Sequence, residues 1–232
     1  MTCRYAIYWT PDPAGPLAAF GAAWLGRDPA LGRDVPAMAL PGIDAAAQRA
    51  ATRSPRRYGL HGTLKPPFVL AEGKAPGDLE ARLAAFAAAA SPFSVPALRL
   101  AGIKGFLALV PSAPCPAIDA LAAAAVRDFD ALRAPAPEAE LARRRAAGLS
   151  ARQDAHLLRW GYPYVFEDFA FHVTLTERLD GEERERFRAT LAPHVAPFCA
   201  APWRFDAVSL LRQETADAPF VLVSRMPLGG PA

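Results

Sequence analysis

The sequence predicts an α+β protein made of two similar half-chains. The tetrapeptide H-x-T-L occurs twice, as His61–Leu64 and His172–Leu175, about half of the 232-residue chain apart. The same order of elements is expected around each copy: a motif strand, a helix and then two strands. The 24 prolines also favour many short elements over a long helical bundle.

The first half-chain opens with a strand and a helix. Residues 4–9 (RYAIYW) are aromatic and β-prone, which is typical of a strand. Leu17, Phe20 and Trp24 then recur at helical spacing before Gly26, a residue type that commonly ends helices. The sequence further predicts short helix 44–51, motif strand 57–64, helices 79–90 and 118–132, and strands 93–100 and 104–110.

In the second half-chain, two helices precede the motif. A charged helix is expected at 138–147, and Ser150 with Gln153 forms a capping-box pattern that opens another helix, 150–160. This Arg-rich hairpin is either a solvated pair of helices or a lid over an anionic substrate. The remaining elements expected are motif strand 169–176, helix 181–191, and strands 205–212 and 220–224.

Each motif copy places its histidine and threonine on one face of a strand. Side chains alternate along a strand, so His61 and Thr63 share a face, as do His172 and Thr174. Two such strands side by side would bring two imidazoles to one groove. Because histidine titrates near pH ~6.5, one imidazole can take a proton from an attacking oxygen while the other protonates a leaving oxygen. The pattern predicts acid–base chemistry on a phosphate ester.

Several other polar residues are candidate substrate contacts. Arg57 and Lys65 are expected on the strand face of His61, where they would balance charge on a phosphate. The lobe that carries them should therefore hold more of the negative charge of the substrate. The other candidates are Tyr162, Tyr164, Arg212 and Gln213.

Composition limits the class of protein and its partners. The net charge of +3 suits a small anionic ligand and is too weak to indicate duplex nucleic acid. The three cysteines are far apart, and no apolar run is long enough to cross a membrane. We therefore expect a reduced, cytoplasmic protein that makes no membrane contact. No cofactor and no metal are expected, since only Asp168 offers a third ligand and its spacing does not favour one.

Together the two motifs resemble those of the 2H phosphoesterase superfamily, named for two H-x-[ST]-x motifs. The stretches RRYGLHGTLKPPF, WGYPYVFEDFAFHVTLT and LLRQ resemble one branch, which is associated with phosphonate metabolism and has no known function. The resemblance covers almost the whole chain. One departure is Gly62, where alanine is more common; its side-chain position points away from the site, so we expect the exchange to matter little.

The resemblance implies a bilobal fold. Each lobe would have an antiparallel sheet with outer helices, and the lobes would be related by a pseudo-two-fold axis at a central cleft. We expect a single domain over residues 1–232, with lobes at about 1–134 and 135–232 and strands that can cross between them.

The resemblance also implies metal-independent hydrolysis of a small, often cyclic, phosphodiester. His61 and His172 would form the acid–base pair, without a decision on which is the base, and Thr63 and Thr174 would donate to the phosphate. Two alternatives stay open. RNA-end processing would need a broad basic or aromatic surface, and a non-catalytic phosphoester-binding protein would not need two titrating groups.

Overall fold

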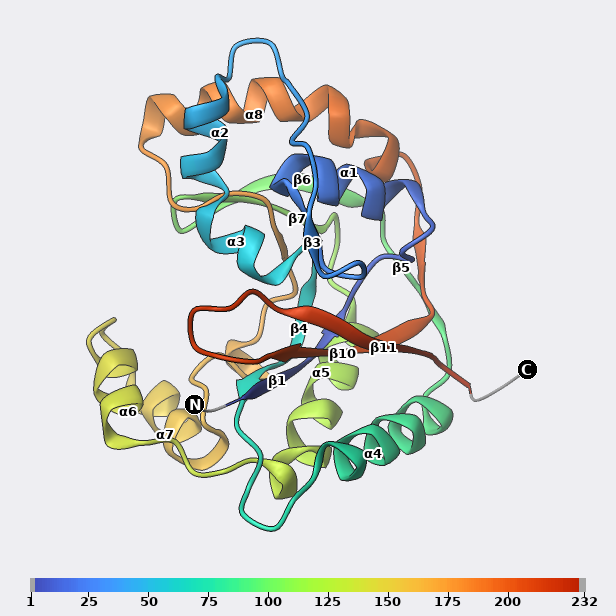
Figure 1. Cartoon of the computed structure of the whole chain (residues 1–232), viewed down its shortest axis with the longest axis vertical. Coiled ribbons are helices and arrows are strands. Elements are labelled where there is room, and N and C mark those ends of the chain that lie inside the picture. Colours follow the sequence, from blue (N-terminus) through green and yellow to red (C-terminus); the bar gives the residue numbers. More distant parts are fainter. Residues whose placement is uncertain (1–2, 230–232) are drawn as a thin grey trace.

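The centre of the fold is a seven-stranded antiparallel sheet with the order β11-β10-β1-β4-β8-β7-β6 (Figure 1). It is seen in a computed structural model, which describes residues 3–229. The strands are β1 (Arg4–Trp9), β4 (Gly62–Phe68), β6 (Leu98–Ile103), β7 (Phe106–Pro111), β8 (Val173–Thr174), β10 (Ala207–Gln213) and β11 (Val221–Pro227). Two small sheets pair β2 (Arg27–Asp28) with β3 (Arg33–Asp34), and β5 (Phe93–Val95) with β9 (Trp203–Phe205).

Helices complete the predicted α+β class. They are α1 (Pro16–Leu25), α2 (Ala45–Ala51), α3 (Arg53–Tyr58), α4 (Pro76–Ala89), α5 (Pro116–Asp128), α6 (Glu138–Arg145), α7 (Ala151–Trp160) and α8 (Gly181–Val195), with short 3-10 turns at Asp130–Leu132, Phe166–Asp168 and Ala196–Cys199. Two predicted caps are confirmed: Gly26 ends α1 in a left-handed conformation, and Ser150 with Gln153 forms the capping box of α7. The predicted cap Asp78 is instead inside the first turn of α4, whose N-cap is Ala75. Within the part of the chain that the structure describes, no helix is long and apolar enough to cross a membrane.

The prediction of two separate sheets is wrong, because strands of both half-chains join in one. The hairpin β6–β7 follows the first motif, yet it lies beside the second motif strand, β8. The hairpin β10–β11 follows the second motif and lies on the side of β4, separated from it by β1. Since β1 pairs with both β4 and β10, we propose that the chain folds as a single domain.

The two faces of the sheet have different roles. Tyr5, Ile7 and Trp9 of β1 point into the main core, where the apolar sides of α4, α5 and α8 also pack. The alternate positions Ala6 and Tyr8 belong to a small separate cluster on the other face. The main helices therefore cover one face of the sheet, and the opposite face is left for the site.

Both predicted motif strands begin later than expected. Residues 57–58 end helix α3, which has Pro55 near its start, where a missing N–H costs nothing. In the second copy only Val173 and Thr174 form a strand. In each copy a carbonyl just before the motif bonds to the histidine side chain, so it is not available to a strand ladder.

Candidate active site

The two motif strands are neighbours, and their equivalent residues meet. Gly62 of β4 pairs antiparallel with Val173 of β8, and both are the second residue of H-x-T-L. This register places His61 opposite Thr174 and Thr63 opposite His172. Residues directly opposite have Cβ atoms about 5 Å apart, and diagonal neighbours are about 7–8 Å apart. By this register the histidines are diagonal neighbours on one face.

Both histidines make the same hydrogen bond. His61 Nδ1 lies 2.8 Å from the carbonyl of Gly59, and His172 Nδ1 lies 2.7 Å from the carbonyl of Ala170. A carbonyl can only accept, so Nδ1 carries the proton in each ring and a neutral ring has a lone pair on Nε2. Gly59 has φ +74°, and a Cβ there would overlap Pro29, so glycine is required for this carbonyl to face the ring.

The surroundings lower the pKa of both imidazoles. Burial, followed by the charge of His172, lowers the pKa of His61 from 6.5 to about 4, despite the bond to Gly59. Burial also lowers the pKa of His172, with a smaller contribution from Lys104. The His61 ring stacks on Tyr8 with ring centroids 4.1 Å apart, which accounts for much of its burial. Both histidines are therefore neutral in the free protein at neutral pH.

The depressed pKa of His61 predicts a pH dependence of stability. Between pH 6.5 and about 4 the unfolded chain binds a proton that the folded chain does not, so stability falls as pH falls through this window. From pH 7.5 to 5 this should remove about 2 kcal/mol from the free energy of unfolding. Urea unfolding at both pH values should show a smaller loss for His61→Gln than for wild type. Equal losses would contradict the lowered pKa.

The motif side chains line two cavities. The larger, of about 590 Å³, is lined by His61, Thr63 and Thr174. The smaller, of about 290 Å³, is lined by His172 and again by Thr63. Tyr162 also lines both, so the two cavities meet beside the motifs. Together they form the site cleft.

The predicted helical hairpin forms a wall of this cleft. Glu140, Arg143 and Arg144 of α6 line the larger cavity. Arg144 also stacks over Tyr162, with its Cζ atom 4.7 Å from the ring centroid. The arginine run of α6 is thus not merely a solvated face. Figure 1 shows α6 and α7 side by side, apart from the main body of helices.

Three of the candidate contacts line the cleft. Arg57 and Tyr162 line the larger cavity, and Tyr164 lines the smaller. Arg57 was predicted to lie on a strand, but it reaches the cleft from the end of α3. Its guanidinium donates to the carbonyl of Ala216. Tyr164 lies under Lys104, whose Nζ is 4.8 Å from the ring centroid.

Lys65 does not line the cleft, and the prediction for it is wrong. Thr63 pairs with Tyr8, but Lys65 pairs with Ile7, so one extra residue of β4 is bulged between them. The bulge moves Lys65 to the helix-covered face, on the side of Ile7. There the side chain is 2% exposed, and its Nζ donates to the carbonyl of Val126 at 2.9 Å. Burial lowers its pKa to about 8, although Asp130 opposes this shift.

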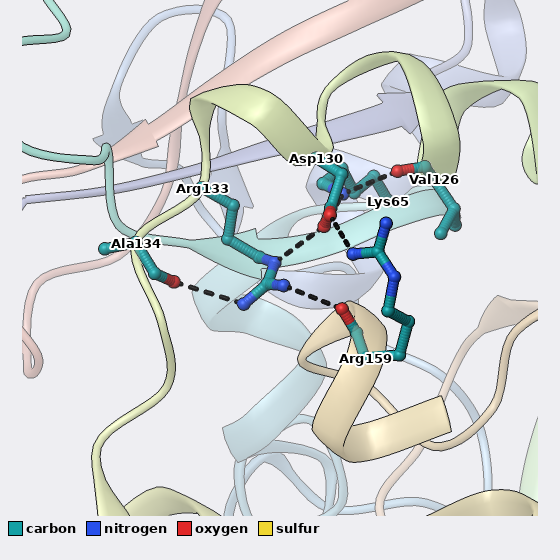
Figure 2. A network of polar contacts seen from close by, with 6 residues as sticks. All are labelled: Lys65, Val126, Asp130, Arg133, Ala134 and Arg159. Atoms are coloured by element: carbon teal, nitrogen blue, oxygen red, sulfur yellow. Dashed lines mark hydrogen bonds and ion pairs between the residues drawn. The ribbon is translucent and has the colours of Figure 1, made fainter. Parts of the chain in front are cut away.

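The Lys65 ammonium belongs to a structural network (Figure 2). Asp130 lies 3.9 Å from Lys65 Nζ and accepts from Arg133 at 3.0 Å and from Arg159 at 2.8 Å. Arg133 also donates to the carbonyls of Ala134 and Arg159. Figure 2 shows these contacts joining β4, the end of α5 and the helix α7. The Asp130 network thus fixes the hairpin that forms a wall of the cleft.

Arg212 and Gln213 also differ from their predicted role. Arg212 pairs with Tyr5, which points into the core, so Arg212 lies on the face away from the cleft and bonds to Glu214 at 2.7 Å. Gln213 lies on the cleft face, but its amide is already used. It accepts from Arg4 at 2.7 Å and donates to the carbonyl of Ala218 at 2.6 Å. It holds Arg4 in position and is not itself a lining residue.

Arg4 and Tyr8 also line the larger cavity, although neither was predicted as a site residue. The signal was available, because Arg4, Ala6 and Tyr8 alternate with the large apolar residues of β1. Lys104 and Arg178 beside His172 were also missed; they belong to a tight turn and to a loop without a periodic pattern.

The expectation that alanine in place of Gly62 would matter little is wrong. A Cβ at this position would overlap the edge of the Phe171 ring, which is 7% exposed and lies among Trp9 and Trp203. Gly62→Ala should therefore lower the free energy of unfolding by about 1–3 kcal/mol, as overpacking does. Gly77→Ala is the control, since nothing lies within 4 Å of its added methyl group. Equal urea midpoints for the two variants would contradict the overlap.

Among residues 3–229, no group of three or more His, Cys, Asp or Glu side chains is placed to hold a metal ion. Asp168, the carboxylate considered for that role, is instead bonded to Arg152 and Gln153. These bonds lower its pKa to about 2.

Several solved structures align with almost the entire chain, but weakly. One titled as a phosphoesterase has a TM-score of 0.41 at 14% identity and covers 97% of this chain and 98% of its own. The protein TT0787 of Thermus thermophilus has a TM-score of 0.42 at 18% identity, with full coverage of both chains. E. coli LigT complexed with 3′-AMP has a TM-score of 0.39 at 12% identity, covering 98% and 99%. Similarities of this size carry no argument about this chain.

Two curated relatives are much more similar in sequence. Both are named ribose 1,5-bisphosphate phosphokinase PhnN. The protein from Janthinobacterium sp. (strain Marseille) is 43% identical over 98% of this chain and 51% of its own length. The protein from Laribacter hongkongensis (strain HLHK9) is 41% identical over 94% of this chain and 50% of its own length. The chain spans about half the length of these relatives.

A family model matches residues 63–221, which is more than half of the chain and includes both threonines of the motifs. Its description is a protein of unknown function, DUF1045. This match confirms the predicted placement in a family of unknown function. The chain belongs to the DUF1045 family.

Proposed function

We propose that the protein is a phosphodiesterase that hydrolyses a small cyclic phosphate ester by histidine acid–base catalysis without a metal. The observation that carries the proposal is the pair of imidazoles with the same Nδ1–H tautomer, each directly before one of the paired residues Gly62 of β4 and Val173 of β8. The diagonal spacing of about 7–8 Å leaves room for a phosphate between them.

The strongly lowered pKa of His61 favours this residue as the base and leaves the role of acid to His172. His61, with a pKa of about 4, is neutral over most of the accessible pH range and takes the proton of the attacking water at Nε2. His172 is neutral in the free protein; it takes up a proton from solvent as the anionic phosphate binds beside it, and gives this proton to the leaving oxygen. A P–O bond to water forms as the P–O bond to the leaving oxygen breaks, and His61 then returns its proton to solvent.

The remaining motif residues act on the charge of the phosphate. Thr63 and Thr174 lie opposite the two histidines, where their hydroxyls donate to non-bridging oxygens. Arg143 and Arg144 of α6, in the wall of the larger cavity, stabilise the negative charge that builds up in the transition state. They also make the His61 side of the cleft the more positive one. The sequence predicts that more of the negative charge of the substrate lies beside Arg57 and Lys65. Of these two residues, only Arg57 lies at the cleft and can have this role.

The names of the relatives point to a phosphorylated ribose as the substrate skeleton. Because those proteins are about twice as long as the matched region, their kinase activity is not transferred to this chain. A ribose or nucleoside cyclic phosphate fits a cleft formed by cavities of about 590 and 290 Å³.

A substrate panel tests the proposal. The purified protein should hydrolyse nucleoside 2′,3′-cyclic phosphates or ribose cyclic phosphates faster than a short RNA that ends in a cyclic phosphate. Preference for the RNA would replace the small-molecule assignment with RNA-end processing. No turnover on any substrate, together with tight binding of phosphate esters, would favour a non-catalytic binding protein.

A further inference from the structure

We infer that the larger cavity contains a second anion subsite, formed by Arg4 and Arg57, which binds a phosphomonoester carried by the substrate besides the scissile diester. The inference rests on the proposed function, which places the scissile phosphate between the two histidines. It names a substrate class: a small cyclic phosphodiester that also carries a terminal phosphate.

The two arginines are joined in one hydrogen-bond network. Gln213 accepts from Arg4 Nε at 2.7 Å, and its amide nitrogen donates to the carbonyls of Ala216 and Ala218 at 3.3 and 2.6 Å. The guanidinium of Arg57 donates to the same Ala216 carbonyl. Gln213, which is 1% exposed, therefore holds Arg4 directly, and it shares the Ala216 carbonyl with Arg57. Because this buried amide uses both its oxygen and its nitrogen, the two guanidinium groups are held in place and differ from freely solvated arginines.

The charge of these groups is not neutralised by the protein. Within residues 3–229, neither Arg4 nor Arg57 has a carboxylate within ion-pair distance, and their partners are a neutral amide and a backbone carbonyl. On the facing wall, Arg143 and Arg144 share the single carboxylate of Glu140, at distances of 2.5 and 2.8 Å. The cavity thus has four arginines and one glutamate among its lining residues. Such a surplus of guanidinium groups suits phosphate oxygens.

The subsite is separate from the reacting phosphate. Arg4 and Tyr8 lie on the same face of β1, and Tyr8 stacks on His61. Four residues along a strand span about 13 Å, so the Arg4 backbone lies well beyond the imidazoles. The Arg4 side chain is held at Gln213, its partner on β10, so it would meet a group on the far side of a sugar ring and not the diester held by Thr63 and Thr174.

Ligand binding tests the subsite apart from catalysis. Isothermal titration should show adenosine 3′,5′-bisphosphate binding at least about 10-fold more tightly than adenosine 3′-phosphate, as expected for added charge-assisted hydrogen bonds. In Arg4→Met and Arg57→Met the gain should fall below about 3-fold. Arg186→Met, which changes an exposed arginine of α8, should keep the full gain. Equal affinity for the two nucleotides in wild type, or a gain unaffected by either variant, would overturn the subsite.

Kinetics separate this inference from the proposed function. The kcat/KM for adenosine 2′,3′-cyclic phosphate should rise at least about 10-fold when the nucleoside also carries a 5′-phosphate. Hydrolysis of both compounds at equal rates, without a binding gain, would overturn the subsite and leave the phosphodiesterase standing. A binding gain that depends on the arginines, with no hydrolysis of either compound, would overturn the phosphodiesterase and leave the subsite standing.

Discussion

Replacing either His61 or His172 with glutamine should lower kcat for a cyclic phosphodiester by about 10²–10⁴-fold, the usual size of one proton-transfer role. Glutamine has a similar reach but cannot exchange a proton near neutral pH. In His61→Gln the attacking water loses its base, and in His172→Gln the leaving oxygen loses its acid. Because the two groups act on one phosphate, the double variant should lose less than the product of the single losses.

Steady-state rates for the single and double variants, measured beside His194→Gln, provide the test. His194 lies near the end of α8 and lines neither site cavity, so its replacement should leave kcat within about twofold of wild type, since it takes no part in proton transfer. Folding of each variant is checked by its urea midpoint. Full activity in a folded His61→Gln or His172→Gln protein would contradict the roles of the two motifs.

Asp130→Ala should be the most destabilising of the substitutions considered, lowering the free energy of unfolding by about 3–5 kcal/mol. It removes the one carboxylate of the network that faces Lys65, Arg133 and Arg159, and Lys65 is 2% exposed. Lys65 would then be left as a buried, uncompensated charge. Lys65→Met should cost less, about 1.5 kcal/mol or below, because methionine fills similar space and Asp130 keeps both arginines.

The control for this comparison is Asp128→Ala. Asp128 pairs with Arg82 at 3.1 Å, but both side chains are more than one-third exposed, so the loss should stay within about 1 kcal/mol. Amide hydrogen exchange should also speed up across α6 and α7 in Asp130→Ala, since Arg159 ties α7 to the network. A cost for Asp130→Ala no larger than for Asp128→Ala would show that the network does not stabilise the fold.

Much of the site was predictable because it depends on local periodicity. The repeated H-x-T-L predicted that His61, Thr63, His172 and Thr174 share one face, and the register of Gly62 with Val173 places them so. The confirmed helix caps were predictable for the same reason, since each depends on a few adjacent residues. Tyr162 and Tyr164, chosen by position, also line the cleft.

The errors come from contacts between distant parts of the chain. The alternation of side chains along a strand assigned Lys65 to the cleft, but one bulged residue between Thr63 and Lys65 turns the Lys65 side chain to the opposite face. The same alternation, counted from β1, would have placed Arg4 on the cleft face and Arg212 on the opposite face, but it requires the pairing of β1 with β10. The overlap at Gly62 depends on Phe171, which no local pattern places beneath it. The single sheet likewise results from hairpins that cross between half-chains.

The most direct test of the central claim is the turnover of a cyclic phosphodiester by protein stripped of metal with EDTA and assayed in metal-free buffer. We predict that kcat equals that of the untreated protein and that the double variant of His61 and His172 loses at least about 10²-fold in kcat under the same conditions. Loss of turnover on chelation, with recovery on adding one divalent ion, would contradict catalysis by two imidazoles alone.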